Sequence, residues 1–244
     1  MAKSKNQKVI LMQARELQRT RGKVVVRSKK MIDKDFNKLA ATVDVEGEKI
    51  IYDIIGFKKN FKKSLILTNS ISVKESANVM NKLYKVKDKI KNFNMIESKV
   101  LNSYNKKYAA GTVTKVTKVT ENKINKIVTE RQKEGLGAKQ IAKEVRENVK
   151  GMTKSRSLTI ARTETAKASG YSNHELAKQG LSNKKVWVHT GGGKKDRTEH
   201  SDMNMLEANI DDKFPNGLLY AHEPGASAEE VISCYCGTVY KFRY

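Results

Sequence analysis

The chain's two cysteines stand one residue apart, in the stretch EEVISCYCGTVYKF at 229–242. In an extended strand, side chains two positions apart point to the same face, so Cys234 and Cys236 would lie side by side. A tetrahedral zinc site could use both thiolates with two imidazoles, and His200 and His222 are the obvious partners. Structural zinc sites usually separate paired cysteines by about two to four residues, and this spacing is shorter. Spacing alone therefore favours two buried free thiols, with zinc as the alternative.

Acid–base chemistry has a weaker basis in this sequence. The stretch DRTEH places Asp196, Arg197 and His200 close together, but no nucleophile elbow and no H-E-x-x-H motif accompany them. We interpret His200 as a histidine hydrogen-bonded within a loop. In ARTET, Arg162 and Glu164 are two residues apart on an expected helix and do not face each other. We therefore expect each of them to join a different neighbour rather than to form a catalytic pair.

The net charge of +23 is concentrated in the first part of the chain. Residues 1–150 hold 36 Lys and Arg against 15 Asp and Glu, a net of +21, whereas residues 151–244 hold 13 against 11, a net of +2. Such an excess attracts polyanions through counterion release, and it favours nucleic acid as a partner. The alternative is a set of helices whose lysine faces are simply solvated. No apolar run is long enough to span a membrane, and no signal peptide is apparent, so we expect cytoplasmic synthesis.

Helices are expected over most of the first part of the chain. We divide it into a basic N-terminal arm at 1–30, expected to be mobile, and a helical region at 31–134. The ambiguous stretch at 41–57 is expected to be helical, and Ala110-Gly111 to end a helix. One apolar stripe is expected on residues Val79, Leu83, Val86, Ile90, Phe93 and Ile96.

Residues 135–244 mix helical and strand patterns, and we expect them to form a domain of their own. Two helices, at 135–151 and 154–180, are followed by a strand at KVWVHT, a polar helix or turn near His200, and a last strand that includes the cysteines. The predicted fold class is therefore α+β: an elongated, mainly helical, basic N-terminal region followed by a small compact α+β C-terminal domain.

The order of motifs in the second part resembles the phage Mu protein F-like head morphogenesis family. The resemblance covers about residues 135–244, from LTIARTETAKASGYSN through KVWVHT and DRTEHSDMNMLEANIDDKFPNG to HEPGASAEEVISCYCGTVYKF. The family usually ends in Asn-Cys-Arg-Cys, where this chain has Ser233-Cys234-Tyr235-Cys236, and its Asp and Arg are further apart than Asp196 and Arg197. The residues that match, which the resemblance implies hold the C-terminal fold, are Arg162, Thr163, Glu164, Trp187, Asp196, Arg197, His200 and Phe214.

The resemblance implies a minor head protein of a tailed phage. Such a virion component would lie in the head interior or at the portal vertex, contact the portal protein and other head proteins, and take part in head assembly, genome packaging or DNA ejection. The basic region would bind DNA without sequence preference, and the four Cys and His ligands would hold a structural zinc. We expect no enzymatic turnover. The alternatives are a metal-dependent hydrolase or toxin-like transferase, or a host nucleic-acid-binding protein.

Overall fold

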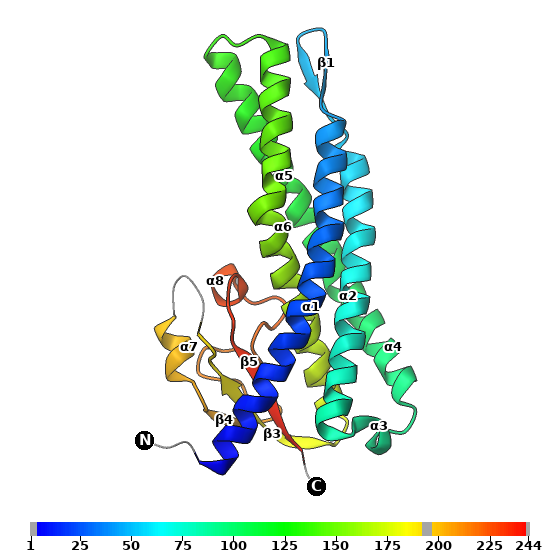
Figure 1. Ribbon diagram of the computed structural model, residues 1–244, viewed down its shortest axis with the longest axis vertical. Coiled ribbons are helices and arrows are strands. Elements are labelled where there is room, and N and C mark those ends of the chain that lie inside the picture. The colour runs from blue at the N-terminus through cyan, green and yellow to red at the C-terminus, as the bar shows by residue number, and fades with distance from the viewer. Residues whose placement is uncertain (1–3, 192–196, 243–244) are drawn as a thin grey trace. The chain divides into compact units, whose positions relative to one another are not determined.

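A computed structural model of the chain describes residues 4–191 and 197–242. The fold is mostly helical with small antiparallel sheets, which confirms the α+β class (Figure 1). Asp196 lies outside the described residues. Among the helices of the described residues, none combines the length and the apolar character needed to cross a membrane.

The helices and strands alternate along the chain in an irregular order. The helices are α1 (Lys5–Ala41), α2 (Ile54–Tyr84), α3 (Val86–Lys89), α4 (Phe93–Tyr104), the π-helix η1 (Asn105–Ala109), α5 (Ala110–Lys133), α6 (Ala138–Ala177), α7 (Thr198–Asp202) and α8 (Ala228–Val231). The strands are β1 (Asp44–Glu46), β2 (Lys49–Ile51), β3 (Ser182–Val188), β4 (Glu207–Asn209) and β5 (Gly237–Phe242).

Residue contacts divide the chain into two units, each built from separate segments. Unit 1 contains residues 1–25, 69–104 and 162–244, and unit 2 contains residues 26–68 and 105–161. The helices α1, α2 and α6 contribute residues to both units. The consecutive segments 1–30, 31–134 and 135–244 remain a prediction about domains, since contacts group segments that are far apart in the sequence.

The prediction of a mobile N-terminal arm was wrong. Helix α1 begins at Lys5, and its residues Ala14, Leu17 and Val24 are buried. Chain termini are usually poorly ordered, but burial of these apolar side chains stabilises the helix at this terminus.

The prediction of a helix at 41–57 was also wrong. Strands β1 and β2 form a hairpin in which Asp44 pairs with Ile51 and Glu46 with Lys49. Gly47 occupies the turn with φ +59°, a conformation that glycine adopts without a steric penalty. Helix α2 starts only at Ile54, after this hairpin.

Two glycines that were expected to end helices lie inside helices instead. Gly111 lies inside α5, which continues directly from η1, and Gly151 lies inside α6, which merges the two helices predicted at 135–151 and 154–180. An interior glycine costs a helix only about 1 kcal/mol, and packing of the neighbouring turns exceeds that cost. The apolar stripe predicted at 79–96 does not lie on one continuous helix. The chain leaves the helical conformation at Lys85 and Asn92, both with positive φ.

Unit 1 is built around the three-stranded antiparallel sheet in the order β4-β3-β5. Val186 and Val188 of β3 face one side and pack with Ala14 and Leu17 of α1. Trp187 points to the other side, as the alternation of a strand requires. Its cluster contains Met203, Phe214, Leu218, Ala221 and Cys236. The sheet therefore separates a face covered by α1 from a face covered by α7, Met203 and the irregular segment after β4.

Unit 2 is helical apart from its hairpin. Phe36 of α1 packs on Phe57 of α2 with ring centroids 5.1 Å apart, and Phe61 stacks on Phe57 at 5.9 Å. Arg156 of α6 lies over the Phe36 ring and donates a hydrogen bond to the carbonyl of Val116 in α5. These contacts join the helical segments of the unit around one core.

Candidate metal centre

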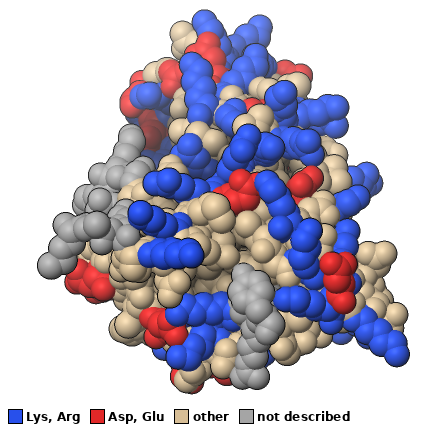
Figure 2. Space-filling view, turned by 60° about the horizontal axis from the view of Figure 1, so that its bottom comes forward, with Lys and Arg blue, Asp and Glu red and all other residues tan. Residues whose placement is uncertain are grey.

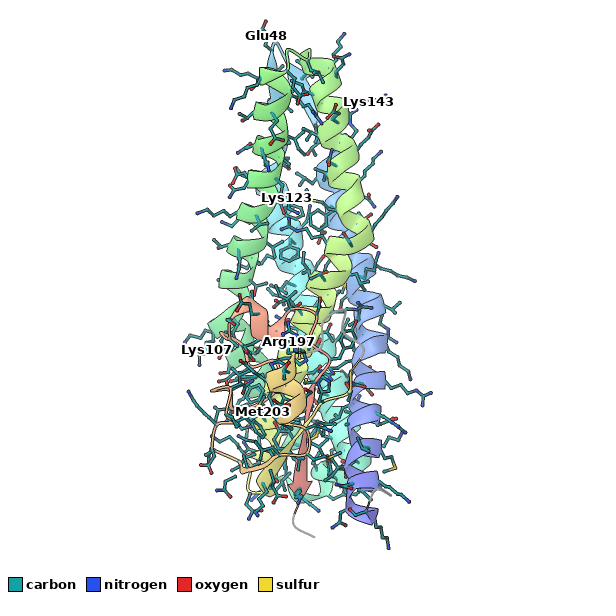
Figure 3. The ribbon with its side chains drawn as sticks, turned by 90° about the vertical axis from the view of Figure 1, so that its left-hand side faces the viewer. Glu48, Lys107, Lys123, Lys143, Arg197 and Met203 are labelled. Carbon is teal, nitrogen blue, oxygen red and sulfur yellow. The ribbon has the colours of Figure 1, made fainter. Side chains whose placement is uncertain are left out.

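Short elements on the Trp187 face of the sheet position the candidate ligands. His200 lies in the one-turn helix α7, whose ends are flanked by Arg197 and Met203 (Figure 3). The His200 ring meets the Trp187 ring edge-on at 5.2 Å, so the core of unit 1 fixes its position. Cys234 and Cys236 lie between α8 and β5, because β5 begins only at Gly237. The prediction that the last strand includes the cysteines was therefore wrong.

The two cysteines nevertheless converge on one histidine. His200 Nδ1 lies 3.4 Å from Cys234 Sγ and 3.5 Å from Cys236 Sγ. The three candidate ligand atoms all lie within 4.8 Å of one another. Zn–S bonds of about 2.3 Å and Zn–N bonds of about 2.0 Å at a tetrahedral angle place sulfur and nitrogen about 3.5 Å apart. The observed distances fit that geometry, and a set of two thiolates and an imidazole suits zinc.

A carboxylate holds the His200 ring in the orientation that a metal ligand needs. His200 Nε2 lies 2.8 Å from Glu230 Oε2, and the same oxygen accepts a hydrogen bond from Asn216 Nδ2 at 2.9 Å. This leaves Nδ1 directed at the sulfur atoms, the arrangement by which outer groups fix a metal-binding histidine. The hydrogen bond with Cys234, and then that with Glu230, raises the pKa of His200 although burial opposes the shift.

The two thiols shift each other's pKa in opposite directions. Hydrogen bonds from Cys236 and His200 lower the pKa of Cys234, and the neighbouring Cys234 together with burial raises the pKa of Cys236. The backbone N–H of Cys236 also donates to Cys234 Sγ at 3.4 Å. Arg21 of α1 donates to the Cys236 carbonyl at 3.3 Å, which brings a cation close to the pair.

The predicted ligand His222 lies close to the site but outside the group of three. Its Nε2 lies 3.1 Å from the carbonyl oxygen of Cys236, and burial lowers its pKa to about 4. A ligand role for His222 therefore stays a prediction. A residue that sequence reasoning missed is His189, whose Nδ1 lies 3.4 Å from Cys236 Sγ. It directly follows β3, within KVWVHT, but no local pattern marks it as a ligand, and only the pairing of β3 with β5 brings it to Cys236.

The remaining motif residues contact different partners in the fold. Trp187 and Phe214 meet edge-on at 5.2 Å within the buried cluster, and Arg197 donates to the carbonyl of Ile232 at 2.7 Å. Arg162 and Glu164 have different partners. The guanidinium of Arg162 lies over the Tyr235 ring, while Glu164 pairs with Lys167 at 3.1 Å and its neighbour Thr163 is buried. That the matched residues together hold the C-terminal fold stays a prediction.

The cluster can also be considered as a nucleophile. Cys234, His200 and Glu230 follow one another in the order of a thiol, a base and an orienting acid. However, Cys234 is only partly exposed and His200 only 1% exposed, so a substrate would have to displace the core around the histidine. Burial favours a closed structural site over catalysis.

Comparison with known protein families identifies the family of the segment that contains the site. Residues 122–239 match the family model of the phage Mu protein F-like proteins. This segment belongs to the phage Mu protein F-like family. The Mu F-like segment contains all of α6, the strands β3 and β4, and every residue of the cysteine–histidine cluster. No curated protein and no solved structure matches the chain.

The family confirms the resemblance recognised in the sequence, and it implies a phage head morphogenesis protein. The Mu F-like segment begins at residue 122, within α5, so it includes residues of both units. The family assignment therefore covers the cluster and part of the basic helical region.

Proposed function

We propose that this chain is a minor head protein of a tailed phage, located at the portal vertex, where it contacts the portal protein and the packaged DNA. Its part in head assembly, packaging or ejection is structural rather than catalytic. The observation that supports the DNA contact is the exposed lysine face of α5, described below. Membership of the phage Mu protein F-like family supports the location in the head.

Both units carry a net positive charge. Dividing the sequence at residue 150 instead assigns almost all of the charge to the first part. Unit 2 contains 24 Lys and Arg against 11 Asp and Glu, a net of +13, and unit 1 contains 25 against 15, a net of +10. The charge of unit 1 comes from residues 1–25, with a net of +6, and residues 69–104, with a net of +4, since residues 162–244 are balanced. On the face in Figure 2, Lys and Arg side chains far outnumber Asp and Glu.

Helix α5 carries the clearest candidate surface for DNA. Its residues Val113, Thr117, Thr120 and Ile124 are buried and define its inner face. Lys115, Lys118 and Lys123 are exposed. At 100° per residue, Lys115 and Lys118 lie on the side opposite the buried residues, and Lys123 lies on the flank of the helix. Residues 105–126 contain six lysines and one acidic residue, Glu121. Lys107 and Lys123 are labelled in Figure 3.

Lysines in this arrangement neutralise phosphates without reading bases. Each is a flexible point charge, and phosphate contacts position a protein on DNA but carry no sequence information. Binding should therefore be indifferent to sequence and should weaken steeply as salt is added.

The test is the salt dependence of duplex binding by the full chain. We expect replacement of Lys115, Lys118 and Lys123 by Gln to reduce the slope of log K against log salt by up to about 2.7, since each phosphate contact contributes about 0.9. Fluorescence anisotropy with a duplex of arbitrary sequence, at several salt concentrations, measures this slope.

A matched control removes the same charge from a different place. Lys82, Lys178 and Lys184 pair with Glu16, Asp211 and Glu207 at 2.7, 2.8 and 2.9 Å. Their replacement by Gln also lowers the net charge by three but should change the slope less. Equal slopes for the two triple variants would reject the α5 surface as the DNA site.

Location and the portal contact need their own measurement. We expect mass spectrometry of purified phage particles to find the chain, and the tagged chain to retain the portal protein from a prohead extract. A host nucleic-acid-binding protein would be absent from particles. Retention of other head proteins without the portal would contradict the portal contact alone.

A further inference from the structure

We propose that His189, His200, Cys234 and Cys236 form a closed, four-ligand structural zinc site, with His189 as the fourth ligand. The site would hold the segment between α8 and β5 against α7 and the end of β3. This inference does not depend on the DNA or portal contacts proposed above.

The pairing of strands brings His189 to the cysteines. In the antiparallel pair of β3 and β5, Val188 lies opposite Gly237, so the same register places His189 opposite Cys236. The register continues for one more position, where Thr190 donates to the carbonyl of Tyr235 at 2.7 Å. The fourth ligand is therefore positioned by the sheet itself.

Three sulfur–nitrogen distances already match those of a zinc tetrahedron. His200 Nδ1 lies 3.4 and 3.5 Å from the two sulfurs, and His189 Nδ1 lies 3.4 Å from Cys236 Sγ. The expected distance is about 3.5 Å. The ligand atoms of His200, Cys234 and Cys236 are mutually within 4.8 Å, and rotation of the half-buried His189 side chain toward His200 would complete the set.

His222 is the competing fourth ligand. Its Nδ1 is buried and has no hydrogen-bond partner among residues 4–191 and 197–242. However, its other ring nitrogen is held by the carbonyl of Cys236 rather than by a sulfur, and His222 is not within the ligand group. His189 contacts a ligand atom directly, which favours it.

The surroundings of the cluster are those of a closed site. Trp187, Met203 and Phe214 form an apolar wall, and Glu230 with Asn216 orients His200. The chain between β4 and β5 contains a single helical turn, α8, so few backbone ladders secure it. A metal that joins Cys234 and Cys236 to His200 would close a loop of more than 30 residues and stabilise this region.

The metal content of the purified full chain provides the first test. We expect about one zinc per chain by mass spectrometry. Replacement by Co²⁺ should give thiolate-to-metal charge-transfer bands and the intense visible bands of a tetrahedral site. Trp187 is the sole tryptophan and touches His200, so its fluorescence should report loading of the folded protein. A folded chain that binds neither Zn²⁺ nor Co²⁺, or one whose cysteines are joined in a disulfide after preparation under reducing conditions, would overturn the site.

Histidine variants then identify the fourth ligand. We expect His189→Asn to weaken Zn²⁺ binding at least about tenfold and to change the Co²⁺ spectrum, because water replaces a nitrogen ligand. His222→Asn should bind Zn²⁺ within about threefold of the parent chain, and so should His174→Asn, a buried histidine outside the cluster. Near-ultraviolet circular dichroism checks that each variant is folded. Loss of binding in His222→Asn with retention in His189→Asn would overturn the assignment of His189.

Discussion

His174 shows how burial alone can set the charge of a single residue in this fold. It is buried in α6, with its ring against Tyr220 and its Nδ1 3.4 Å from the hydroxyl of Tyr240. Burial, and then the nearby charges of Lys185 and Lys178, lower its pKa to about 3, and Asp211 opposes the shift only weakly. The folded protein therefore holds this imidazole neutral at every pH above that value.

The pH dependence of stability follows from this shift. The unfolded chain takes up a proton at His174 below about pH 6.5, whereas the folded chain does not until about pH 3, so stability falls as pH decreases between these values. Between pH 7.5 and 5.5 the loss from this group is about 1.4 kcal/mol. We expect His174→Asn to reduce the pH dependence by about that amount, measured as urea unfolding free energies with a chelator present throughout. An unchanged pH dependence would contradict a neutral His174.

The ligands at the metal centre could be predicted in part from residue type. His200, Cys234 and Cys236 were recognisable as soft donors near the end of the chain, and the fold does bring them together. His189 could not be recognised, because only the register of β3 on β5 places it beside Cys236. The sequence does not specify that register until both strands are known.

At the scale of elements, α6 contains two glycines in contrasting surroundings. A methyl group added at Gly151 would have no atom within 4 Å, whereas one at Gly170 would lie 3.0 Å from the carbonyl oxygen of Ala221 and 3.4 Å from the Tyr220 ring. Gly170 therefore permits the close approach of the 220–221 turn to the helix.

The two alanine variants should change stability in opposite directions. We expect Gly151→Ala to stabilise the chain by about 0.5–1 kcal/mol through its higher helix propensity. Gly170→Ala should destabilise it by about 1–3 kcal/mol because the turn must move away. Chemical denaturation of both variants measures the difference, and a gain of stability at Gly170 would show that the contact is not tight.

The elements themselves were predictable where periodicity was strong and local. The apolar and lysine repeats correctly predicted that most of residues 31–134 are helical, and KVWVHT correctly predicted a strand, which is part of β3. The hairpin at 44–51 was missed because its isoleucines also fit a helical repeat, so only the turn at Gly47 distinguishes the two. The breaks at Lys85 and Asn92 were missed because neither residue is a glycine or a proline.

At the scale of the whole molecule, the first turns of α1 belong to the core of the last strands. Leu17 is 6% exposed and packs with Val186, Val188 and Val239 of the sheet, while Gln18 donates to the carbonyl of Tyr235 at 2.7 Å. Dividing the sequence into the consecutive segments 1–30, 31–134 and 135–244 could not predict the packing of α1 on β3 and β5. Local periodicity does not indicate which distant strand a helix will cover.

A matched pair of substitutions on α1 tests this packing. We expect Leu17→Ala to destabilise unit 1 by about 2–5 kcal/mol, since it opens a cavity against the sheet. Met12→Ala, on the same stretch but 58% exposed, should change stability by less than about 0.5 kcal/mol. Thermal unfolding followed by Trp187 fluorescence reports on the sheet, and equal effects of the two variants would contradict a structural role for the N-terminal turns.

The interleaved segments of the two units also have a consequence for synthesis on the ribosome. Residues 26–161 contain every segment of unit 2, so its core can close before the sheet of unit 1 has been translated. The apolar side of the first turns of α1 must wait for β3 and β5, which follow more than 150 residues later. Throughout that interval the nascent chain displays Ala14 and Leu17 without their strand partners, and we expect this stretch to attract a chaperone.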